Sequence, residues 1–181
     1  MSRAEFDEFV DRKQKHQVDG AVLDPQIQIA EWQGRLNELY GLIDGFMASY
    51  IKDAKATSSR HEITLNEEFS GPYAAPELVL EIGQSTILFK PVGTMLIGSR
   101  GRVDVLGPRG NSRLALVDRI IDRASQMVSV RLIEPGAIEM QPPEKRAVDW
   151  VWKIITPAPQ MRFIELDEGS FFDMILNVAD A

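Results

Sequence analysis

The hydrophobic positions between residues 29 and 50 follow one another at steps of three and four. In an α-helix such positions lie on one face, whereas a strand would divide them between its two faces. The spacing therefore predicts one long helix from Pro25 to about Lys55, with Asp24 as its N-cap and proline at its first position. The members of this apolar stripe are Ile29, Trp32, Leu36, Leu39, Ile43, Phe46 and Tyr50.

The stripe has two interpretations. Either it packs on a sheet formed by the rest of the chain, or it forms a coiled-coil seam with another chain, with Tyr40 and Met47 beside the seam. Charged residues flank the stripe sparsely and a sheet needs a cover, so we favour packing within the chain. Gly34 and Gly41 lie off the stripe, and each costs about 1 kcal/mol relative to alanine. They indicate either weak local selection, which we favour, or the close approach of a second backbone.

After a polar break at 56–59, the hydrophobic period changes from that of a helix to that of strands. Glycine and proline punctuate the chain at short intervals, with a loop at 71–76 and the clearest turn at 107–111. Residues 118–126 fit either a helical turn or an excursion of the sheet. The alternation predicts strands at 63–69, 78–82, 86–90, 94–97, 102–106, 113–117, 128–132, 138–140, 148–155 and 161–166.

A final helix containing Phe171, Phe172 and Met174 is predicted to begin at a cap formed by Asp167 or Ser170. The strands are separated by turns and not by crossover helices, which indicates antiparallel pairing. We therefore predict an α+β fold. A mainly antiparallel sheet of about eight to ten short strands packs against one long N-terminal amphipathic helix, with a short C-terminal helix.

The first 20 residues are interpreted as a helical arm, and residues 21–181 as a single α+β domain. Within the arm, Phe6, Phe9 and Val10 line one side of a weaker helix over 3–18. Glycine accepts the left-handed conformation that follows many helices, so this helix is expected to stop before residue 20. The arm either packs on its own domain or docks on a second copy of the chain.

Composition limits the possible chemistry. The 181 residues include no cysteine, which excludes disulfides, thiolate metal sites and cysteine nucleophiles. The first residues show no apolar signal region, and no apolar run approaches the ~20 residues of a membrane span, so we expect a cytoplasmic protein with no membrane contact. The net charge is −7, but the segment 100–131 holds seven arginines and three aspartates and is locally basic.

No catalytic set is recognisable in the sequence. His16 and His61 are the only histidines, and both are interpreted as surface residues without a neighbouring nucleophile or acid. No carboxylate spacing matches a known metal-ligand pattern, and the glycines at 93–110 fit hairpin turns better than a phosphate loop. We therefore predict a protein that is not an enzyme and has no metal or cofactor.

Two groups of residues are candidates for binding. The first is a group of four arginines, Arg100, Arg102, Arg109 and Arg113. The last three are expected to converge near one end of a hairpin. The group either binds an anion or a partner, or pairs with the chain's own acidic residues. The second is Trp150 and Trp152, which share a strand face with Val148 and Ile154. This row is either a stacking platform or, as we favour, core packed on the apolar stripe.

The leading hypothesis is a non-enzymatic protein that binds another macromolecule. A partner-specific inhibitor, an immunity-type protein or an assembly subunit would fit, with another protein or a second copy of the chain as the partner. One alternative is a nucleic-acid-associated accessory protein that uses the arginines of 100–131. Another is a β-cup that holds a small ligand between helix and sheet.

Overall fold

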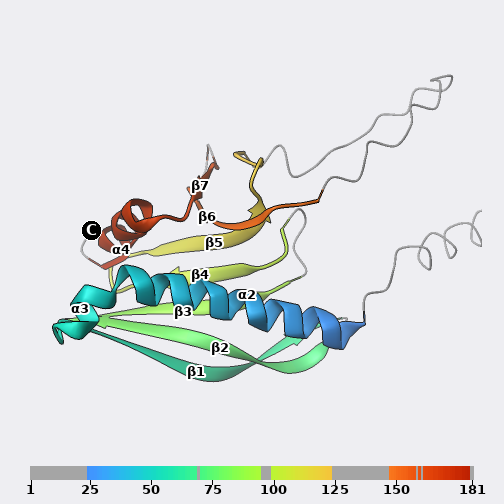
Figure 1. The fold of residues 1–181 in the computed structure, drawn as a ribbon, viewed down its shortest axis with the longest axis horizontal. Helices are drawn as coiled ribbons and strands as arrows, with labels where there is room; N and C mark the ends of the chain where they lie inside the picture. The colour runs from blue at the N-terminus through green and yellow to red at the C-terminus, as the bar shows by residue number, and fades with distance from the viewer. Residues whose placement is uncertain are drawn as a thin grey trace, which may run out of the picture.

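The computed structural model describes residues 24–68, 70–94, 99–123, 147–157, 159 and 161–179. Within them, seven strands form one antiparallel sheet in chain order (Figure 1). The strands are β1 (Ala56–Glu67), β2 (Gly71–Ile82), β3 (Ser85–Gly93), β4 (Arg102–Leu106), β5 (Asn111–Asp118), β6 (Trp150–Ile155) and β7 (Phe163–Glu165). The helices are α2 (Pro25–Phe46), α3 (Ala48–Lys52) and α4 (Glu168–Ala179). The predicted α+β fold is confirmed.

Several predicted elements fall outside the described residues. They are the arm at 1–20 with its helix at 3–18, most of the strand at 94–97, and the strands at 128–132 and 138–140. Elsewhere, the turn predicted at 107–111 joins β4 to β5, where the Gly107 amide donates to the Gly110 carbonyl at 2.9 Å. Strand β6 begins at Trp150 and not at Val148, because its partner β5 ends at Asp118, opposite Trp150.

The polar break predicted at 56–59 and the loop predicted at 71–76 are both wrong, because these residues belong to β1 and β2. The two strands pair without interruption from Ala56–Ile82 to Glu67–Gly71. The start of β1 carries mostly polar side chains, so the sequence shows no hydrophobic alternation there. These side chains form hydrogen bonds with other side chains and do not pack in the core. The Ser58 hydroxyl donates to Asp44 of α2 at 2.6 Å.

Helix α2 begins as predicted but is shorter. The Asp24 carboxylate accepts a hydrogen bond from the Gln26 amide at 2.9 Å, and Pro25 occupies the first helical turn. The predicted single helix to Lys55 is interrupted at Met47, after which α3 ends at Lys52. Because of this break, Tyr50 does not lie on the buried apolar face of α2, and it is 43% exposed.

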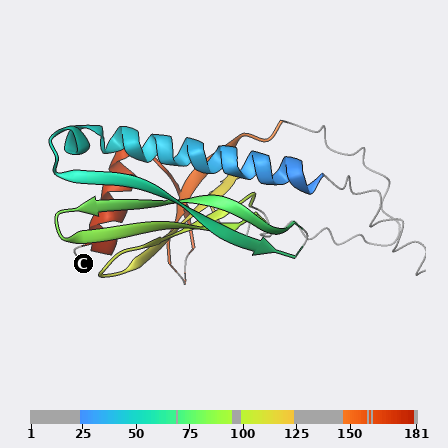
Figure 2. The ribbon, with the colours of Figure 1, turned by 90° about the horizontal axis from the view of Figure 1, so that it is seen from below.

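The rest of the stripe packs on the sheet of its own chain (Figures 1 and 2). Ile29 and Phe46 are half-buried, and the two residues predicted beside the seam, Tyr40 and Met47, are buried. Within the described residues, a Cβ added at Gly34 or Gly41 would meet nothing within 4 Å, so no backbone of this chain approaches there. The buried residues of α2 are Trp32, Leu36, Leu39, Tyr40 and Ile43.

The hairpin formed by β1 and β2 is strongly twisted, and Figure 2 shows the two strands crossing. At one end of β2 the buried side chains are Leu78 and Leu80, and at the other they are Tyr73 and Ala75. These pairs belong to opposite faces of a regular strand, while the register with β1 stays unbroken. The ribbon must therefore twist enough to turn its other face toward the core, as two-stranded ribbons do more than wide sheets.

This twist separates β2 from β3, which pair only between Leu78 and Ile82 of β2. Side chains of α2 bond to carbonyls of β2 beyond that point. The Tyr40 hydroxyl lies 2.9 Å from the Pro76 carbonyl, and the Gln33 amide donates to the Ala74 carbonyl at 2.6 Å. Burial, and then the charge of Glu77, raise the pKa of Tyr40, so its hydroxyl stays protonated as a donor.

Residues 119–123 cross the outer face of β5 and β6, and no helix is found in the described part of the ambiguous segment 118–126. Lys153 of β6 is buried beneath them, and its ammonium group donates to the carbonyls of Arg119 and Ile121 at 2.7 and 2.9 Å. Arg119 itself pairs with Asp149 and Glu165, which raise the pKa of its guanidinium. A buried lysine thus holds this loop on the sheet.

Helix α4 lies beside the C-terminal end of α2 on the same face of the sheet. The Asp167 carboxylate accepts from the Ser170 amide at 2.8 Å, and the Ser170 hydroxyl accepts from the Asp167 amide at 2.9 Å. Both predicted capping residues therefore act together. At the other end of α4, the Val178 carbonyl accepts from the Arg109 amide at 3.0 Å, which attaches the β4–β5 turn.

Among the helices of the described residues, none combines the length and the apolar composition that crossing a membrane requires.

Replacing Gly101 with alanine should destabilise the protein by about 1–3 kcal/mol, because the new methyl group would overpack the core. Its Cβ would lie 2.1 Å from the ring of Trp32, which is itself buried. Gly41→Ala is the matched control and should stabilise by up to about 1 kcal/mol, since it lies in open space on a helix. Urea unfolding measures both. Equal effects of the two substitutions would contradict the packing described here.

The cap of α4 should make stability depend on pH. Hydrogen bonds from the backbone and side chain of Ser170 lower the pKa of Asp167. Its carboxylate therefore stabilises the fold fully above its unfolded pKa of about 4, and this is lost as pH falls through the lower folded value. Asp167→Asn keeps a capping residue that does not titrate. We expect the Tm difference between wild type and this variant to shrink between pH 5 and pH 3.

Candidate partner-binding cleft

The four candidate arginines do not meet at one place. Arg102 opens β4 and Arg109 lies in the turn after that strand, so the two are at opposite ends of it. Arg102 forms an ion pair with Asp104, 3.0 Å between Nε and Oδ1, and Arg113 lies across from Asp104 in the register of β4 and β5. The expected convergence is therefore not observed, and Arg100 occupies a separate site.

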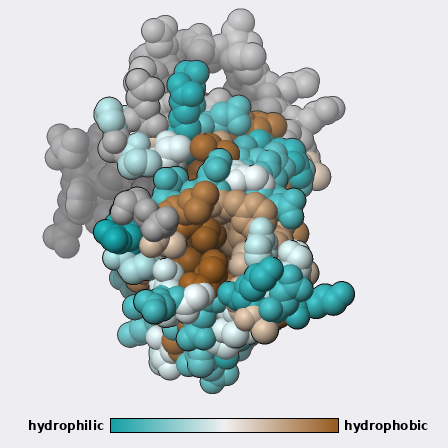
Figure 3. Space-filling view, turned by 90° about the vertical axis from the view of Figure 1, so that its left-hand side faces the viewer, coloured by the Kyte–Doolittle hydropathy of each residue, from teal (hydrophilic) through white to brown (hydrophobic). Residues whose placement is uncertain are grey.

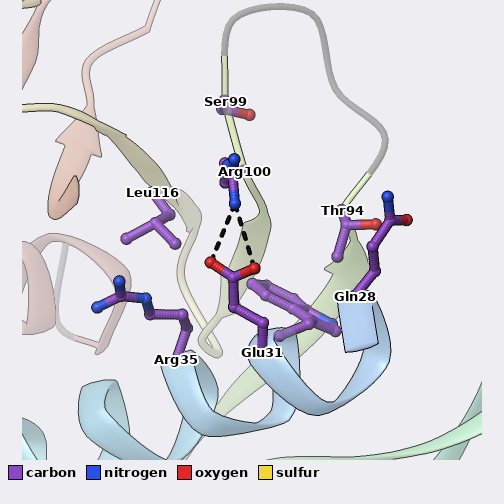
Figure 4. A pocket seen from close by; sticks show the side chains of 8 residues that line it. Gln28, Glu31, Arg35, Thr94, Ser99, Arg100 and Leu116 are labelled. Carbon is purple, nitrogen blue, oxygen red and sulfur yellow. Dashed lines mark hydrogen bonds and ion pairs between the residues drawn. The ribbon is translucent and has the colours of Figure 1, made fainter. Parts of the chain in front are cut away.

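Arg100 lines a cleft of about 240 Å³ between the first turns of α2 and the sheet (Figure 4). In Figure 4, Glu31 points from the helix toward Arg100, while Gln28 lies beside Thr94 and Arg35 lies on the side of Leu116. The cleft thus has polar walls and an apolar floor, where Trp32 and Leu116 are buried. Its lining residues are Gln28, Glu31, Trp32, Arg35, Thr94, Ser99, Arg100 and Leu116.

An ion pair spans the mouth of this cleft. The Nη1 atom of Arg100 lies 3.0 and 3.2 Å from the two carboxylate oxygens of Glu31. The two side chains are 44% and 42% exposed. Exposed pairs of this kind contribute between about 0 and 1 kcal/mol, so this one can be exchanged for another at little cost.

The Arg100 guanidinium also contacts Trp150 of β6. Its Cζ atom lies 5.1 Å from the ring centroid of Trp150, a cation–π contact. The backbone beside it is fixed to β5, because the Arg100 amide donates to the Leu116 carbonyl and the Leu116 amide to the Gly101 carbonyl, both at 2.9 Å. Arg100 therefore has a fixed backbone, a supported side chain and an exchangeable partner.

The two tryptophans of β6 have different environments. Trp152 is buried, and its ring lies 6.0 Å from that of Trp32, so it packs on the apolar stripe. Trp150 is half-buried beneath Arg100, which occupies the ring face that a stacking ligand would use. The indole nitrogens of Trp32 and Trp152 are buried and lack a hydrogen-bond partner in the described structure, which costs about 1–3 kcal/mol each.

A carboxylate clasp fixes the wall of the cleft at Thr94. Glu67, at the end of β1, accepts from the amide and hydroxyl of Thr94 at 2.9 and 2.8 Å. The Tyr73 hydroxyl donates to the same carboxylate at 2.5 Å. Burial, and then Glu67, raise the pKa of Tyr73. Gly93 has a φ of +146°, and a Cβ there would lie 2.5 Å from Glu67, so this close approach requires glycine.

A second surface feature lies at the opposite end of the molecule. Figure 3 looks at this end and shows apolar surface across the middle of the view. We define the end patch as Tyr50, Phe172 and Leu176. Tyr50 contacts Phe172 edge-on at 6.1 Å between ring centroids, and Leu176 is 61% exposed one helical turn after Phe172. Aromatic and aliphatic side chains exposed together mark surfaces that contact other proteins.

No group of three or more histidine, aspartate or glutamate side chains in the described residues is placed to hold a metal ion. His61 lies on the exposed surface of β1, with Nε2 3.2 Å from the Ser59 hydroxyl, and not in the cleft. His16 lies outside the described residues.

Sequence patterns pointed to Arg100, Trp32 and Trp150 but missed the other polar residues of the cleft. Glu31, Gln28 and Arg35 are ordinary polar residues on the polar side of a helix, while Thr94 directly follows β3 and Ser99 lies shortly before β4. Their one available signal was that Glu31 precedes Trp32, the first buried residue of α2. Only the docking of α2 on the sheet brings these side chains to Arg100.

Glu31→Gln should leave the protein folded, with a change of less than about 1 kcal/mol in the free energy of unfolding, because the ion pair it removes is exposed. Trp32→Ala should lower that free energy by about 3–5 kcal/mol, because it empties the floor of the cleft. Guanidinium chloride unfolding compares the two. A large loss in Glu31→Gln would show that the pair is structural and not exchangeable.

The comparisons with known proteins assign no role to this cleft. No family model, curated protein or solved structure matches the chain. Among the described residues, the cleft that holds Arg100 is the surface feature with the most specific arrangement of side chains.

Proposed function

We propose that this protein is a non-catalytic binding protein whose partner is another protein, and that its cleft receives a carboxylate of that partner. The observation that carries the proposal is the Arg100–Glu31 pair, which places an exchangeable carboxylate on an arginine already supported by Trp150. In this interpretation Glu31 occupies the place of the partner's acidic side chain or terminal carboxylate.

The chemistry of the cleft suits a carboxylate. A guanidinium presents several N–H donors in a planar fork that matches the two oxygens of a carboxylate. Ser99 and Gln28 add a neutral hydroxyl and an amide group around it, whereas the Thr94 hydroxyl already donates to Glu67. An incoming carboxylate would find Arg100 oriented in advance, which lowers the entropy cost of binding.

The surrounding charges favour a protein over a nucleic acid. Glu31 and Glu38 lie against the two arginines of the cleft, Arg100 and Arg35. A nucleic acid presents a row of phosphates and requires several cations that are free to neutralise them. The net charge of −7 further repels a polyanion. The end patch, with its exposed Leu176, also supports a protein partner.

A free small carboxylate is a second candidate occupant, because the cleft has the volume of roughly eight waters at about 30 Å³ each. Such a ligand would lie between helix and sheet, as in the β-cup alternative. However, the cleft is open and its walls are charged, which suits the tip of one polar side chain better than an enclosed apolar ligand.

The binding test compares wild type with Glu31→Gln, Arg100→Ala and the control Asp53→Asn, which removes a remote negative charge. Probes are an N-acetylated pentapeptide amide with one glutamate between alanines, free glutarate and a ten-residue oligothymidine, and binding is followed by tryptophan fluorescence. We expect Glu31→Gln to bind the peptide up to about fivefold more tightly than wild type, because it frees Arg100 of a pair worth up to about 1 kcal/mol. Arg100→Ala should lose binding and Asp53→Asn should match wild type.

The other outcomes separate the alternatives. Glutarate binding as tight as peptide binding would favour the small-ligand site. Arg100-dependent binding of oligothymidine in preference to the peptide would favour the nucleic-acid hypothesis and overturn the proposal. Equal binding of the peptide by wild type and Arg100→Ala would show that the cleft is not the site.

A further inference from the structure

Among the residues that the structure describes, strand β1 forms one edge of the sheet and pairs only with β2. It is 12 residues long and contains neither proline nor glycine. Four consecutive residues at its centre, 59–62, are exposed, which means that both faces of the strand are open there. Figure 2 looks onto this edge, and no described helix crosses in front of it. Unpaired N–H and C=O groups along such an edge can form a ladder with a second strand.

We propose that two copies of this chain pair antiparallel through β1, about a two-fold axis at His61, and so join their sheets into one. The interface is isologous, because the same strand is used by both copies. It lies on β1 and not on the Arg100 cleft, so it can be tested separately from the proposed function.

Symmetry limits the possible registers. A two-fold axis perpendicular to the joined sheet keeps each side chain on its own face, so the axis must pass through a residue position and not between two residues. An axis at Arg60 would oppose two arginines, and an axis at Glu62 would oppose two glutamates. Like charges directly opposite each other are destabilising.

An axis at His61 gives the matching register. It places Arg60 of each copy opposite Glu62 of the other, which forms two cross-strand pairs of opposite charge. His61 lies opposite its own copy, and the remaining pairs join Ser59 with Ile63, Ser58 with Thr64, Thr57 with Leu65 and Ala56 with Asn66, so none of them opposes two carboxylates or two arginines. In this register residues 56–66 all have a partner, which is nearly the full length of β1.

In the single chain, the side chains of Arg60 and Glu62 are already placed so that they could form these pairs. Arg60 is held in place, with its Nη2 atom 2.9 Å from Asp44 and its Cζ atom 5.8 Å from the ring centroid of Tyr40. Glu62 lies on the same face and is exposed, and it forms no ion pair in the described residues. A second copy would supply the arginine that Glu62 lacks. Charges on an edge also discourage unspecific pairing, so they select this register over others.

Two charge variants test the register. Arg60→Glu gives a chain with two acidic residues at 60 and 62, and Glu62→Arg gives a chain with two arginines there. Each variant alone opposes like charges, and we expect its dimer dissociation constant to rise at least about tenfold relative to wild type. Mixed together, the two variants restore both opposite-charge pairs and should form a heterodimer. Asp53→Arg, with the same charge change as Glu62→Arg but outside β1, should dimerise as wild type does.

Sedimentation equilibrium over a concentration series measures these constants, with circular dichroism to show that each variant is folded. A wild-type chain that stays monomeric at all concentrations would overturn the proposal. So would a Glu62→Arg variant that dimerises as well as wild type, or a mixture that gains no heterodimer. Hydrogen exchange gives an independent readout, since dimerisation should slow exchange of β1 amides at high protein concentration.

Discussion

The packing of α2 over the line where β2 and β3 separate is the constraint on which the rest of the structure depends. The β1–β2 hairpin turns its other face inward beyond Leu78, so the sheet ladder cannot continue there. Tyr40 and Gln33 bond to carbonyls of β2 across that region, while Leu36 and Leu39 exclude water beside them. A helix with a different face toward the sheet would leave those half-buried carbonyls without these donors.

The cleft is a product of the same docking. Once Trp32 lies against Gly101 and Trp152, the residues on either side of it in the helix face the chain that enters β4. Glu31 then meets Arg100, and Trp150 supports the guanidinium from the sheet. The carboxylate clasp of Glu67 holds the opposite wall through Thr94. The geometry of the cleft is thus set by buried contacts, while its ion pair stays exposed and exchangeable.

The two proposals place recognition on parts of the molecule that differ in rigidity and chemistry. The cleft offers a pre-oriented arginine with a replaceable internal partner, which suits recognition of a single carboxylate. The edge of β1 offers a backbone ladder, in which charged side chains select the register and the backbone supplies the hydrogen bonds. A dimer formed through β1 would leave both clefts available and would give the assembly two copies of the carboxylate site.

Local patterns in the sequence were sufficient for much of the fold. The steps of three and four between residues 29 and 46, the proline after Asp24, the turn at 107–111 and the cap formed by Asp167 and Ser170 each depend on neighbours within a few residues. The polar first half of β1 was missed because an edge strand needs no hydrophobic alternation. Strand β6 begins later than the predicted start at Val148 because β5 ends opposite Trp150.

The sequence by itself therefore determined the long helix up to Met47, the C-terminal helix, most of the described strands and their antiparallel pairing, because these follow from short-range periodicity and turn chemistry. Only the tertiary structure decided which polar residues meet. Glu31 and Arg100 are 69 positions apart, and Arg102, Arg109 and Arg113 are close in sequence but distributed along a hairpin. A pair of side chains from different elements is fixed by how a helix docks on a sheet, and that docking depends on the shape of the whole core.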